Sequence, residues 1–356
     1  MREYSMKRLA AIAFAATIGA GAAQAAEMPK LKFGPTTTNI SVGHAAHSSI
    51  PTEAGFWKEE GIEVEVLGLK GSTAGIQQVA SGQITFCSVG GEALMTARSK
   101  GIPVQAVATY ARESIYRIVS LSDSPIKKPE DMKGKTVGVV NMATGSVPFT
   151  RAVLKSAGID PDSGVKWLAV GLGATAANAM TKKDIDVWAS WDTAVASLEN
   201  GGFKFNFIKP TWFDEVFGNV IIAHEDTIKK HPDWVVKLVR GVAKSVYFGQ
   251  ANPEGTIRNH WKMYPATKPQ TTDMDKAMKN AIHTFKSRFD LFAVPEGVKW
   301  GQHVPKQWER MAEIAKAEKI LPADFDVKAS YTSAFIDDIN KFDKAKIQAM
   351  AKASKW

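Results

Sequence analysis

Ten short apolar runs punctuate the chain up to about residue 223, and segments with helical spacing separate many of them. Short runs rich in Val, Ile and Phe are typical of buried strands. Strands that alternate with helices predict α/β layers with mostly parallel sheets. The predicted strands are Leu31–Gly34, Ile62–Leu67, Ile84–Ser88, Val104–Thr109, Tyr116–Ser120, Thr136–Val140, Val165–Leu168, Ile185–Ala189, Phe203–Ile208 and Val220–Ala223.

The helical segments fall into two groups. Those of the first group lie between the predicted strands, whereas beyond Ala223 strand signals become few and helical spacing dominates. Pairs such as Asn252-Pro253 and Leu321-Pro322 break this second group. The predicted helices are Thr73–Ala80, Ala93–Ser99, Val147–Ala157 and Thr193–Glu199, then Asp233–Phe248, Asp273–Phe289, Lys306–Glu318 and Lys344–Ala353.

A weak internal repeat links two parts of the first group. In each copy a helix opens at glycine, at Gly71 or Gly173, and leads to a strand that runs directly into another helix. The repeat predicts two α/β lobes in which residues 90–92 and 190–192 are equivalent corners. Open α/β sheets bind ligands outside such strand ends. The alternative is a chance likeness between Ala-rich helices.

The N-terminus has the pattern of a secretory signal peptide. Arg2, Lys7 and Arg8 precede an apolar run, which ends at the cleavage-type sequence Ala23-Gln24-Ala25. The apolar run is too short to span a bilayer, which takes about 20 residues. No cysteine follows the run, so we expect no lipid anchor there. We expect residues 1–25 to be removed, leaving a periplasmic chain with a net charge of +7 in place of +9.

Composition excludes several classes of protein. The chain is 45% hydrophobic and 23% charged, which is typical of globular proteins. Its single cysteine, Cys87, excludes an intramolecular disulfide, a cysteine-built zinc site and a CxxC redox pair. The basic residues are spread along the chain without a dense tract, so we expect no nucleic-acid partner.

Several segments, in this order and spacing, resemble one family of periplasmic solute-binding proteins. The segments are Glu53–Val64 (EAGFWKEEGIEV), Gly71–Thr73 with Ala80–Phe86, Lys128–Val139 (KPEDMKGKTVGV) and Gly145-Ser146. The family is the nitrate/sulfonate/taurine and thiamine-pyrimidine-precursor type, which has the type II periplasmic binding protein fold.

The resemblance implies a two-lobed, hinged monomer that delivers a small solute to an ABC permease in the inner membrane. It implies no cofactor and no catalytic residue. Lobe one would comprise residues 26–113 and 224–356, including helices packed on it, and lobe two residues 114–223. The segments Tyr116–Ser120 and Val220–Ala223 would be the strands at which the chain crosses between lobes.

Two predicted helix starts are candidate sites for an acidic ligand group. The free N–H groups and the positive end of a helix dipole attract anions. The alternative is ordinary capping of the helix by its own Ser or Thr. The residues at these two starts are Thr144, Gly145 and Ser146, and Gly71, Ser72 and Thr73.

The two equivalent corners offer further candidates. Gly90 and Gly91 would allow a ligand to approach the backbone closely. Glu92 could accept a hydrogen bond from an amine or hydroxyl of the ligand. Its alternative role is to stabilise the start of its own helix. At the mirrored corner Trp191 could form an aromatic wall, with core packing as the alternative. Asp192 has the same two alternatives as Glu92.

The loop after the first predicted strand contacts ligand in the resembling family. It carries hydroxyl, amide and imidazole groups suited to acidic or carbonyl ligands, and its candidates are Asn39, His44, His47 and Ser48. The alternatives are surface exposure or capping. No acidic third ligand lies near the two histidines in sequence, so we expect no metal. Tyr110 and Asn219 near the hinge are weaker candidates.

The expected function is binding of a small organic anion, such as an alkanesulfonate, taurine or an aromatic carboxylate, for an ABC importer. A thiamine pyrimidine precursor or similar heterocycle is the alternative solute. A periplasmic hydrolase or desulfinase on the same fold, using Cys87 or His44, is the alternative activity. Cys87 lies within an apolar run, which favours a small buried residue over a nucleophile. The pyrimidine-synthesis enzymes of the wider family carry a cysteine-rich segment that this chain lacks.

Overall fold

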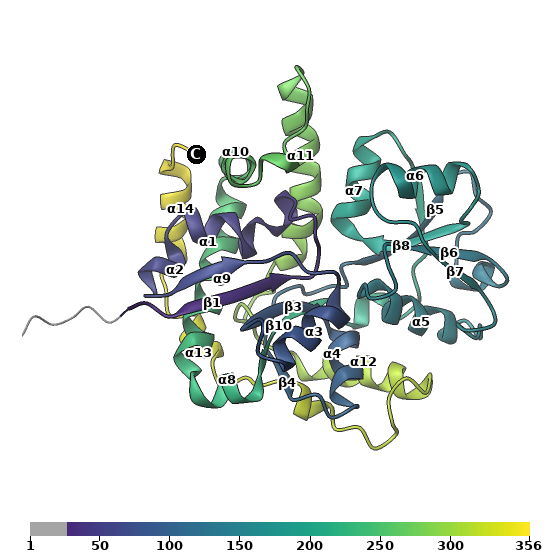
Figure 1. Ribbon diagram of the computed structural model, residues 1–356, viewed down its shortest axis with the longest axis horizontal. Helices are drawn as coiled ribbons and strands as arrows, with labels where there is room; N and C mark the ends of the chain where they lie inside the picture. The colour runs from purple at the N-terminus through teal and green to yellow at the C-terminus, as the bar shows by residue number, and fades with distance from the viewer. Residues whose placement is uncertain (1–26) are drawn as a thin grey trace, which may run out of the picture.

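The computed structural model describes residues 27–356, and Figure 1 shows two α/β lobes. The predicted signal peptide lies outside the described residues. The first lobe is built on a five-stranded sheet of order β2-β1-β3-β10-β4. Its strands are β1 (Lys30–Pro35), β2 (Glu63–Val66), β3 (Phe86–Gly90), β4 (Val104–Thr109) and β10 (Asn219–His224).

The second lobe is built on a sheet of order β7-β6-β8-β5-β9. In both sheets the first three strands run parallel and the fourth, β10 or β5, is antiparallel to its neighbours. All ten predicted strands are confirmed within one or two residues. The strands of the second sheet are β5 (Tyr116–Leu121), β6 (Thr136–Val139), β7 (Lys166–Ala169), β8 (Val187–Trp191) and β9 (Phe205–Phe207).

The internal repeat is confirmed by the topology. Helix α3 (Ser72–Ala80) leads to β3, which runs into α4 (Gly91–Arg98), and α6 (Ala174–Thr181) leads to β8, which runs into α7 (Asp192–Asn200). Strands β3 and β8 hold the same third place in their sheets. The corners that follow them are therefore equivalent.

The remaining helices cover the sheets, and those after β10 pack mainly on the first lobe, as predicted. Among the described residues, no helix is both long and apolar enough to cross a membrane. These helices are η1 (Val42–His47), α1 (Ser49–Glu53), α2 (Phe56–Glu59), η2 (Pro129–Met132), α5 (Ser146–Ser156), η3 (Phe213–Glu215), α8 (Glu225–Lys230), α9 (Pro232–Ala251), α10 (Pro253–Met263), η4 (Pro265–Thr267), α11 (Met274–Phe289), η5 (Asp290–Phe292), α12 (Pro305–Ala317), η6 (Val327–Ser330), α13 (Ile336–Ile339) and α14 (Lys344–Ala353).

Two segments carry the chain between the sheets, residues 110–115 and residues 208–218. They are hydrogen-bonded to each other, since the amide of Gly218 donates to the carbonyl of Ala111 (3.0 Å). The amides of Tyr110 and Ala111 both donate to the carbonyl of Asn219, the first residue of β10 (3.1 and 3.2 Å). Strands β5 and β10 are thus the strands at the crossings, as expected, while the lobe boundaries at 113/114 and 223/224 stay predictions.

The segment with the sequence FWKEEG attaches α9 to the first lobe. The Trp57 indole donates to the carbonyl of Leu238 (3.1 Å), and its ring occupies the space that a side chain at position 241 would need. Gly241 therefore permits the close packing of α9 on α2. This segment carries part of the family resemblance, yet it lies away from the space between the lobes. Its contacts with α9 give it a structural role.

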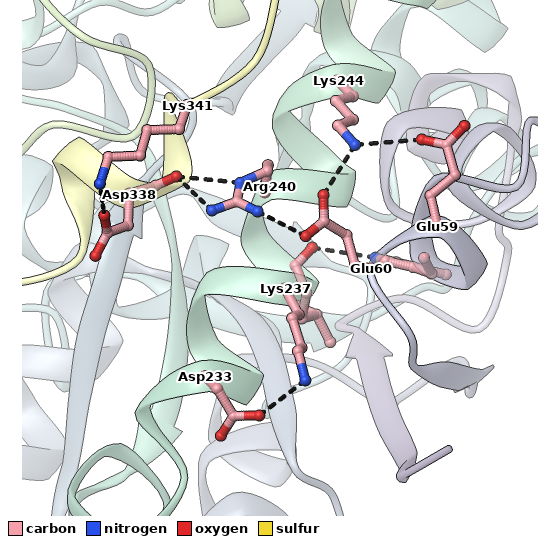
Figure 2. Close-up of polar contacts among 10 residues, drawn as sticks. Glu59, Glu60, Asp233, Lys237, Arg240, Lys244, Asp338 and Lys341 are labelled. Carbon is pink, nitrogen blue, oxygen red and sulfur yellow. Dashed lines mark hydrogen bonds and ion pairs between the residues drawn. The ribbon is translucent and has the colours of Figure 1, made fainter. Parts of the chain in front are cut away.

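A cluster of charges completes this attachment (Figure 2). The carboxylate of Glu60 pairs with Lys244 (2.8 Å) and Arg240 (2.7 Å), and its side chain is only 9% exposed. Arg240 also donates to the carbonyl of Asp338 in α13 (2.7 Å). The buried carboxylate of Glu60, at the end of α2, is thereby joined to α9, and Arg240 extends this connection to α13.

Replacing Glu60 should destabilise the protein far more than replacing an exposed acid of the same cluster. Glu60→Gln leaves Arg240 without its carboxylate partner and Lys244 with only the longer pair to Glu59 (3.3 Å), which costs about 3 kcal/mol of unfolding free energy. Asp233→Asn removes only the surface pair with Lys237 (2.9 Å) and costs about 0.5 kcal/mol or less. Urea unfolding of both variants measures the difference, and equal losses would contradict the structural role of Glu60.

Candidate functional site

A small cavity lies between the lobes, where β1, β3 and β8 end and the two crossings meet. Its volume is about 20 Å³, which is room for one water molecule or one small group. Most of its side chains carry a hydroxyl, imidazole or amide group. The lining residues are Thr36, Thr37, His44, Ser72, Ser88, Tyr110, Ile115, Tyr116, Thr144, Gly145, Trp191, Asn219 and Arg288.

Two helices from opposite lobes begin at this cavity. Ser72 is the first residue of α3, and Gly145 precedes the first residue of α5. The first amides of a helix have no partner within it and carry the positive end of its dipole. A side chain at position 145 would overlap the hydroxyls of Tyr116 and Ser72. Glycine at this position therefore keeps the start of α5 open to the cavity.

A buried ion pair crosses between the lobes beside the cavity. Arg288 of α11 binds both carboxylate oxygens of Asp192, the first residue of α7, with 2.6 Å between Nε and Oδ2. Both side chains are 2% exposed. The amide of Thr193 donates to the same carboxylate (2.8 Å). Because both oxygens of Asp192 are engaged, its role here is to hold Arg288 at the cavity wall.

A second contact joins the same two helices at the far end of α7. The side-chain amide of Asn200 donates to the carbonyl of Asn280 (2.9 Å) and to the hydroxyl of Thr284 (3.0 Å). Figure 1 shows α7 and α11 side by side at the junction of the lobes. The lobes are therefore fastened at both ends of one helix pair.

The two histidines of the first loop are buried and neutral. Burial, followed by the charge of Arg288, holds the pKa of His44 well below its usual value, and the same causes lower the pKa of His47 to about 3. His44 lines the cavity, whereas His47 packs against the rings of Phe33 and Tyr110. Within residues 27–356 no group of three or more His, Cys, Asp or Glu is arranged to hold a metal ion.

A larger groove adjoins the cavity, and Trp191 lines both. Its volume is about 480 Å³ and it is open to solvent. Residues of both lobes form it. Its polar and aromatic lining residues are Asn39, Ser41, Trp191, Thr193, Ser197, Asn200, Trp261, Thr267, Asn280 and Thr284, and the others are Val42, Leu172, Gly173, Ala194, Ala266, Pro269, Ala277 and Ala281.

The structure brings some of the sequence candidates to these two spaces. His44, Ser72, Thr144, Gly145 and Trp191 line the cavity, and Asn39 lines the groove with Trp191. The remaining candidates lie outside both linings. They are His47, Ser48, Gly71, Thr73, Gly90, Gly91, Glu92, Ser146 and Asp192.

Local contacts explain several of these placements. The hydroxyl of Ser146 donates to the carbonyl of Ala189 (3.0 Å), and that of Ser48 donates to the carbonyl of His44 (2.9 Å). Gly91 packs on the ring of Phe217. These residues stabilise the fold beside the cavity, and a direct contact of theirs with ligand stays a prediction.

Thr36 and Thr37 belong to the loop that the family resemblance places at the ligand, although they were not singled out as candidates. Sequence reasoning missed Ser88, Ile115, Tyr116 and Arg288, and it ranked Tyr110 and Asn219 low. One signal was present for Arg288. Arg288 lies on the same face of α11 as the buried residues Ala277, Ala281 and Phe285. A cation on such an apolar face is rarely buried without a partner.

A family model described as "NMT1/THI5 like" matches residues 49–256, which is more than half of the chain. The chain belongs to the NMT1/THI5-like family. One relative, the riboflavin-binding protein RibY of Chloroflexus aurantiacus, is 23% identical over 79% of each chain. Another, the formylaminopyrimidine-binding protein of Halalkalibacterium halodurans, is 24% identical over 58% of this chain and 63% of its own.

Solved structures similar to this family member have the periplasmic binding protein fold. A Bordetella bronchiseptica protein has a TM-score of 0.67 at 18% identity, and the match covers 88% of this chain and 98% of that one. The alkanesulfonate-binding protein SsuA of Xanthomonas axonopodis, solved with MOPS, has a TM-score of 0.64 at 14% identity, with 86% and 99% covered. These likenesses confirm the two-lobed α/β fold.

Some relatives in the NMT1/THI5-like family are named as enzymes. A 4-amino-5-hydroxymethyl-2-methylpyrimidine phosphate synthase of Legionella pneumophila is 23% identical over 81% of this chain and 87% of its own. In the present family member the one thiol, Cys87, is fully buried in β3, and burial raises its pKa. A nucleophilic thiol needs the opposite shift and access to substrate, so this position disfavours Cys87 as a nucleophile.

Glu92 lies in a separate apolar pocket that both lobes form. Pro148 and Ala152 of α5 and Met311 of α12 contribute to its walls. The Oε2 atom of Glu92 and the indole nitrogen of Trp212 are buried there without hydrogen-bond partners among the described residues. Burial raises the pKa of Glu92 to about 8, so this carboxyl stays protonated near neutrality.

The Glu92 pocket predicts a pH dependence of stability. The folded state binds a proton on Glu92 that the unfolded chain releases near pH 4.5, so the contribution of Glu92 to the unfolding free energy should fall as the pH rises from about 4.5 to 8. The buried neutral histidines contribute with the opposite sign, and comparison with Glu92→Gln isolates the Glu92 contribution, roughly 4 kcal/mol over the interval. Urea unfolding at pH 5, 6.5 and 8 measures it, with the exposed Glu254→Gln as control. Parallel pH profiles of Glu92→Gln and the unmodified protein would refute the assignment.

The ion pair between the lobes predicts a large effect of one charge-neutralising change. Asp192→Asn leaves a buried guanidinium without a counter-charge and should lower the unfolding free energy by about 3 kcal/mol or more. Asp162→Asn is the matched control, because Asp162 binds both terminal nitrogens of Arg151 (2.9 Å each) at the surface. That change should cost about 0.5 kcal/mol. Chemical denaturation measures the unfolding free energy of both variants. Similar losses would show that the buried pair stabilises the protein no more than the surface pair does.

Proposed function

We propose that the mature chain is the periplasmic solute-binding component of an ABC importer, and that its two lobes close on a small organic anion. The observation that carries the proposal is the cavity at which α3 and α5 begin from opposite lobes beside Arg288. A monomer that delivers its solute to a permease follows from the family resemblance. No bond of the solute changes in this function.

The cavity suits an acidic group because hydrogen-bond donors converge on it. Helix-start amides and the hydroxyls of Ser72, Thr144 and Tyr116 surround the space, and Arg288 lines it. The charge of Arg288 is already balanced by Asp192. An anion in the cavity would therefore be held mainly by the dipoles of the helix starts, and it would not need an unpaired cation beside it.

Close contacts between the lobes support a function in closure. The amide of Thr73 in α3 lies 3.4 Å from the carbonyl of Ala143 in the other lobe, and a side chain at position 71 would overlap this carbonyl. A side chain at position 43 would overlap Thr193 in the same way. Glycines thus let the lobes meet, and a solute that contacts both lobes favours the closed state over the open one.

A specific observation favours a second solute class, a heterocycle with N–H groups. The Oδ1 atom of Asn219 is buried at the cavity without a hydrogen-bond donor among the described residues. Trp191 supplies an aromatic surface beside it. The names of the riboflavin-binding and formylaminopyrimidine-binding relatives agree with this class, and that of SsuA agrees with the anion.

A thermal-shift screen of the mature chain, starting at Ala26, tests the proposal. The panel holds alkanesulfonates, taurine, aromatic carboxylates, nitrate, pyrimidines and flavins. A ligand of the folded state stabilises it by about 2.7 kcal/mol at a hundredfold excess over its dissociation constant. We expect one class to raise the melting temperature and to be recovered unchanged by chromatography. A solute that binds and is then consumed would instead indicate an enzyme.

Two variants connect the binding to the cavity. Gly145→Val should lower the affinity at least tenfold, because the new side chain occupies the space in front of Tyr116 and Ser72. Ser156→Ala, at the other end of α5, is the control and should bind normally. Asn219→Asp separates the solute classes, since a carboxylate repels an anion but still accepts from a heterocycle N–H. Circular dichroism verifies that each variant is folded, and normal binding by folded Gly145→Val would refute the site.

A further inference from the structure

The groove beside Trp191 has a composition that the rest of the chain does not share. Of its eighteen lining residues none is Asp, Glu, Lys, Arg or His. Charged residues make up 23% of the chain, so about four would be expected in a set of this size. Its polar side chains are hydroxyls and carboxamides alone, and two tryptophans, Trp191 and Trp261, accompany them.

Lys262, Lys268 and Lys279 adjoin lining residues in sequence, but none of them lines the groove. Two further titratable groups beside the lining are engaged with other residues. On α11, Arg288 is bound to Asp192. His283 pairs with Asn200 through Nδ1 (2.9 Å) and lies 3.6 Å from Glu199 through Nε2. A charged group in the groove would therefore find no opposite charge among the lining residues, which is unfavourable wherever the occupant is shielded from water.

The groove adjoins the proposed binding cavity at Trp191, and residues of both lobes are needed to form it. Thr193, Ser197 and Leu172 come from the second lobe, while Trp261 and Asn280 come from the first. Its volume of about 480 Å³ lies in the range of small-molecule sites, whereas the cavity holds only one small group. An occupant of the groove would contact both lobes and so add to the stability of the closed state.

We infer that the groove binds the uncharged remainder of the same solute, a portion rich in hydroxyl or amide groups that lies between Trp191 and Trp261. The inference rests on the proposed function, because the head group in the cavity orients this tail. Hydroxyl and carboxamide side chains exchange hydrogen bonds with such a tail, and the indoles cover its carbon atoms. The solute is accordingly larger than taurine or nitrate, and its tail carries no charge.

Two ligand series with a constant head test the inference by isothermal titration calorimetry. The sulfonate series comprises ethanesulfonate, pantoyltaurine with an uncharged amide and hydroxyl tail, and N-succinyltaurine with a carboxylate tail. The ring series comprises lumiflavin, riboflavin with an uncharged hydroxylated tail, and riboflavin 5′-phosphate. In the series that binds, we expect the uncharged-tail member to bind at least tenfold more tightly than both others.

A variant assigns that preference to the groove. Ser197 is exposed on α7 at the groove wall, so Ser197→Lys should fold normally and place a cation there. It should shift the preference at least tenfold towards the member with an anionic tail and leave the tail-less member within threefold. The control is Ser81→Lys, which adds the same charge at the exposed end of α3, outside the groove, and should change no preference.

The outcomes separate this inference from the proposed function. If a tail-less member binds within threefold of its uncharged-tail counterpart, or if Ser197→Lys leaves the preference unchanged, the inference is wrong while binding in the cavity stands. If no member of either series binds, the proposed head groups are wrong and the inference fails with them. A tenfold preference that Ser197→Lys shifts supports both.

Discussion

The closed arrangement of the lobes depends on one buried ion pair, Arg288 with Asp192. It joins α11 to α7 next to the cavity, where water is largely excluded and an unpaired charge would be costly. Each residue therefore requires the other, and separation of the lobes must either break the pair or carry it into water. Asn200 repeats the contact at the other end of α7 with uncharged groups. The two contacts fix the walls between which the groove lies.

The site combines a tight polar cavity with a wider neutral groove, and the helix starts explain the first part. Dipoles of α3 and α5 attract negative charge without adding a net charge of their own. The one cation in the cavity lining is compensated by Asp192. Recognition in such a site depends on hydrogen-bond geometry, which distinguishes solutes that share a charge but differ in shape.

Local sequence patterns were sufficient for the elements but not for the site. All ten strands followed from apolar runs. The central strands β3 and β8 are buried at every residue and so leave a continuous apolar signal, whereas the edge strands β2, β7 and β9 are partly exposed and leave a weaker one. Arg288 was missed because its partner Asp192 lies 96 residues away. Tyr116 was assigned to a crossing strand, and no local pattern shows that its hydroxyl reaches Ser72 and Gly145. Glu92 was a candidate either for ligand contact or for stabilising the start of its own helix, and no local pattern shows that helices from distant parts of the chain enclose it in an apolar pocket.

The order of strands along the chain has a consequence for folding. The second sheet uses one continuous segment, from β5 to β9, whereas the first sheet stays incomplete until β10 is inserted between β3 and β4. Contacts that join distant segments form slowly because they close long loops. In a chain that is synthesised from its N-terminus, the first lobe therefore lacks its fourth strand until residue 224 has emerged. Strand β3 stays without its β10 neighbour during that time, while the second lobe can already fold.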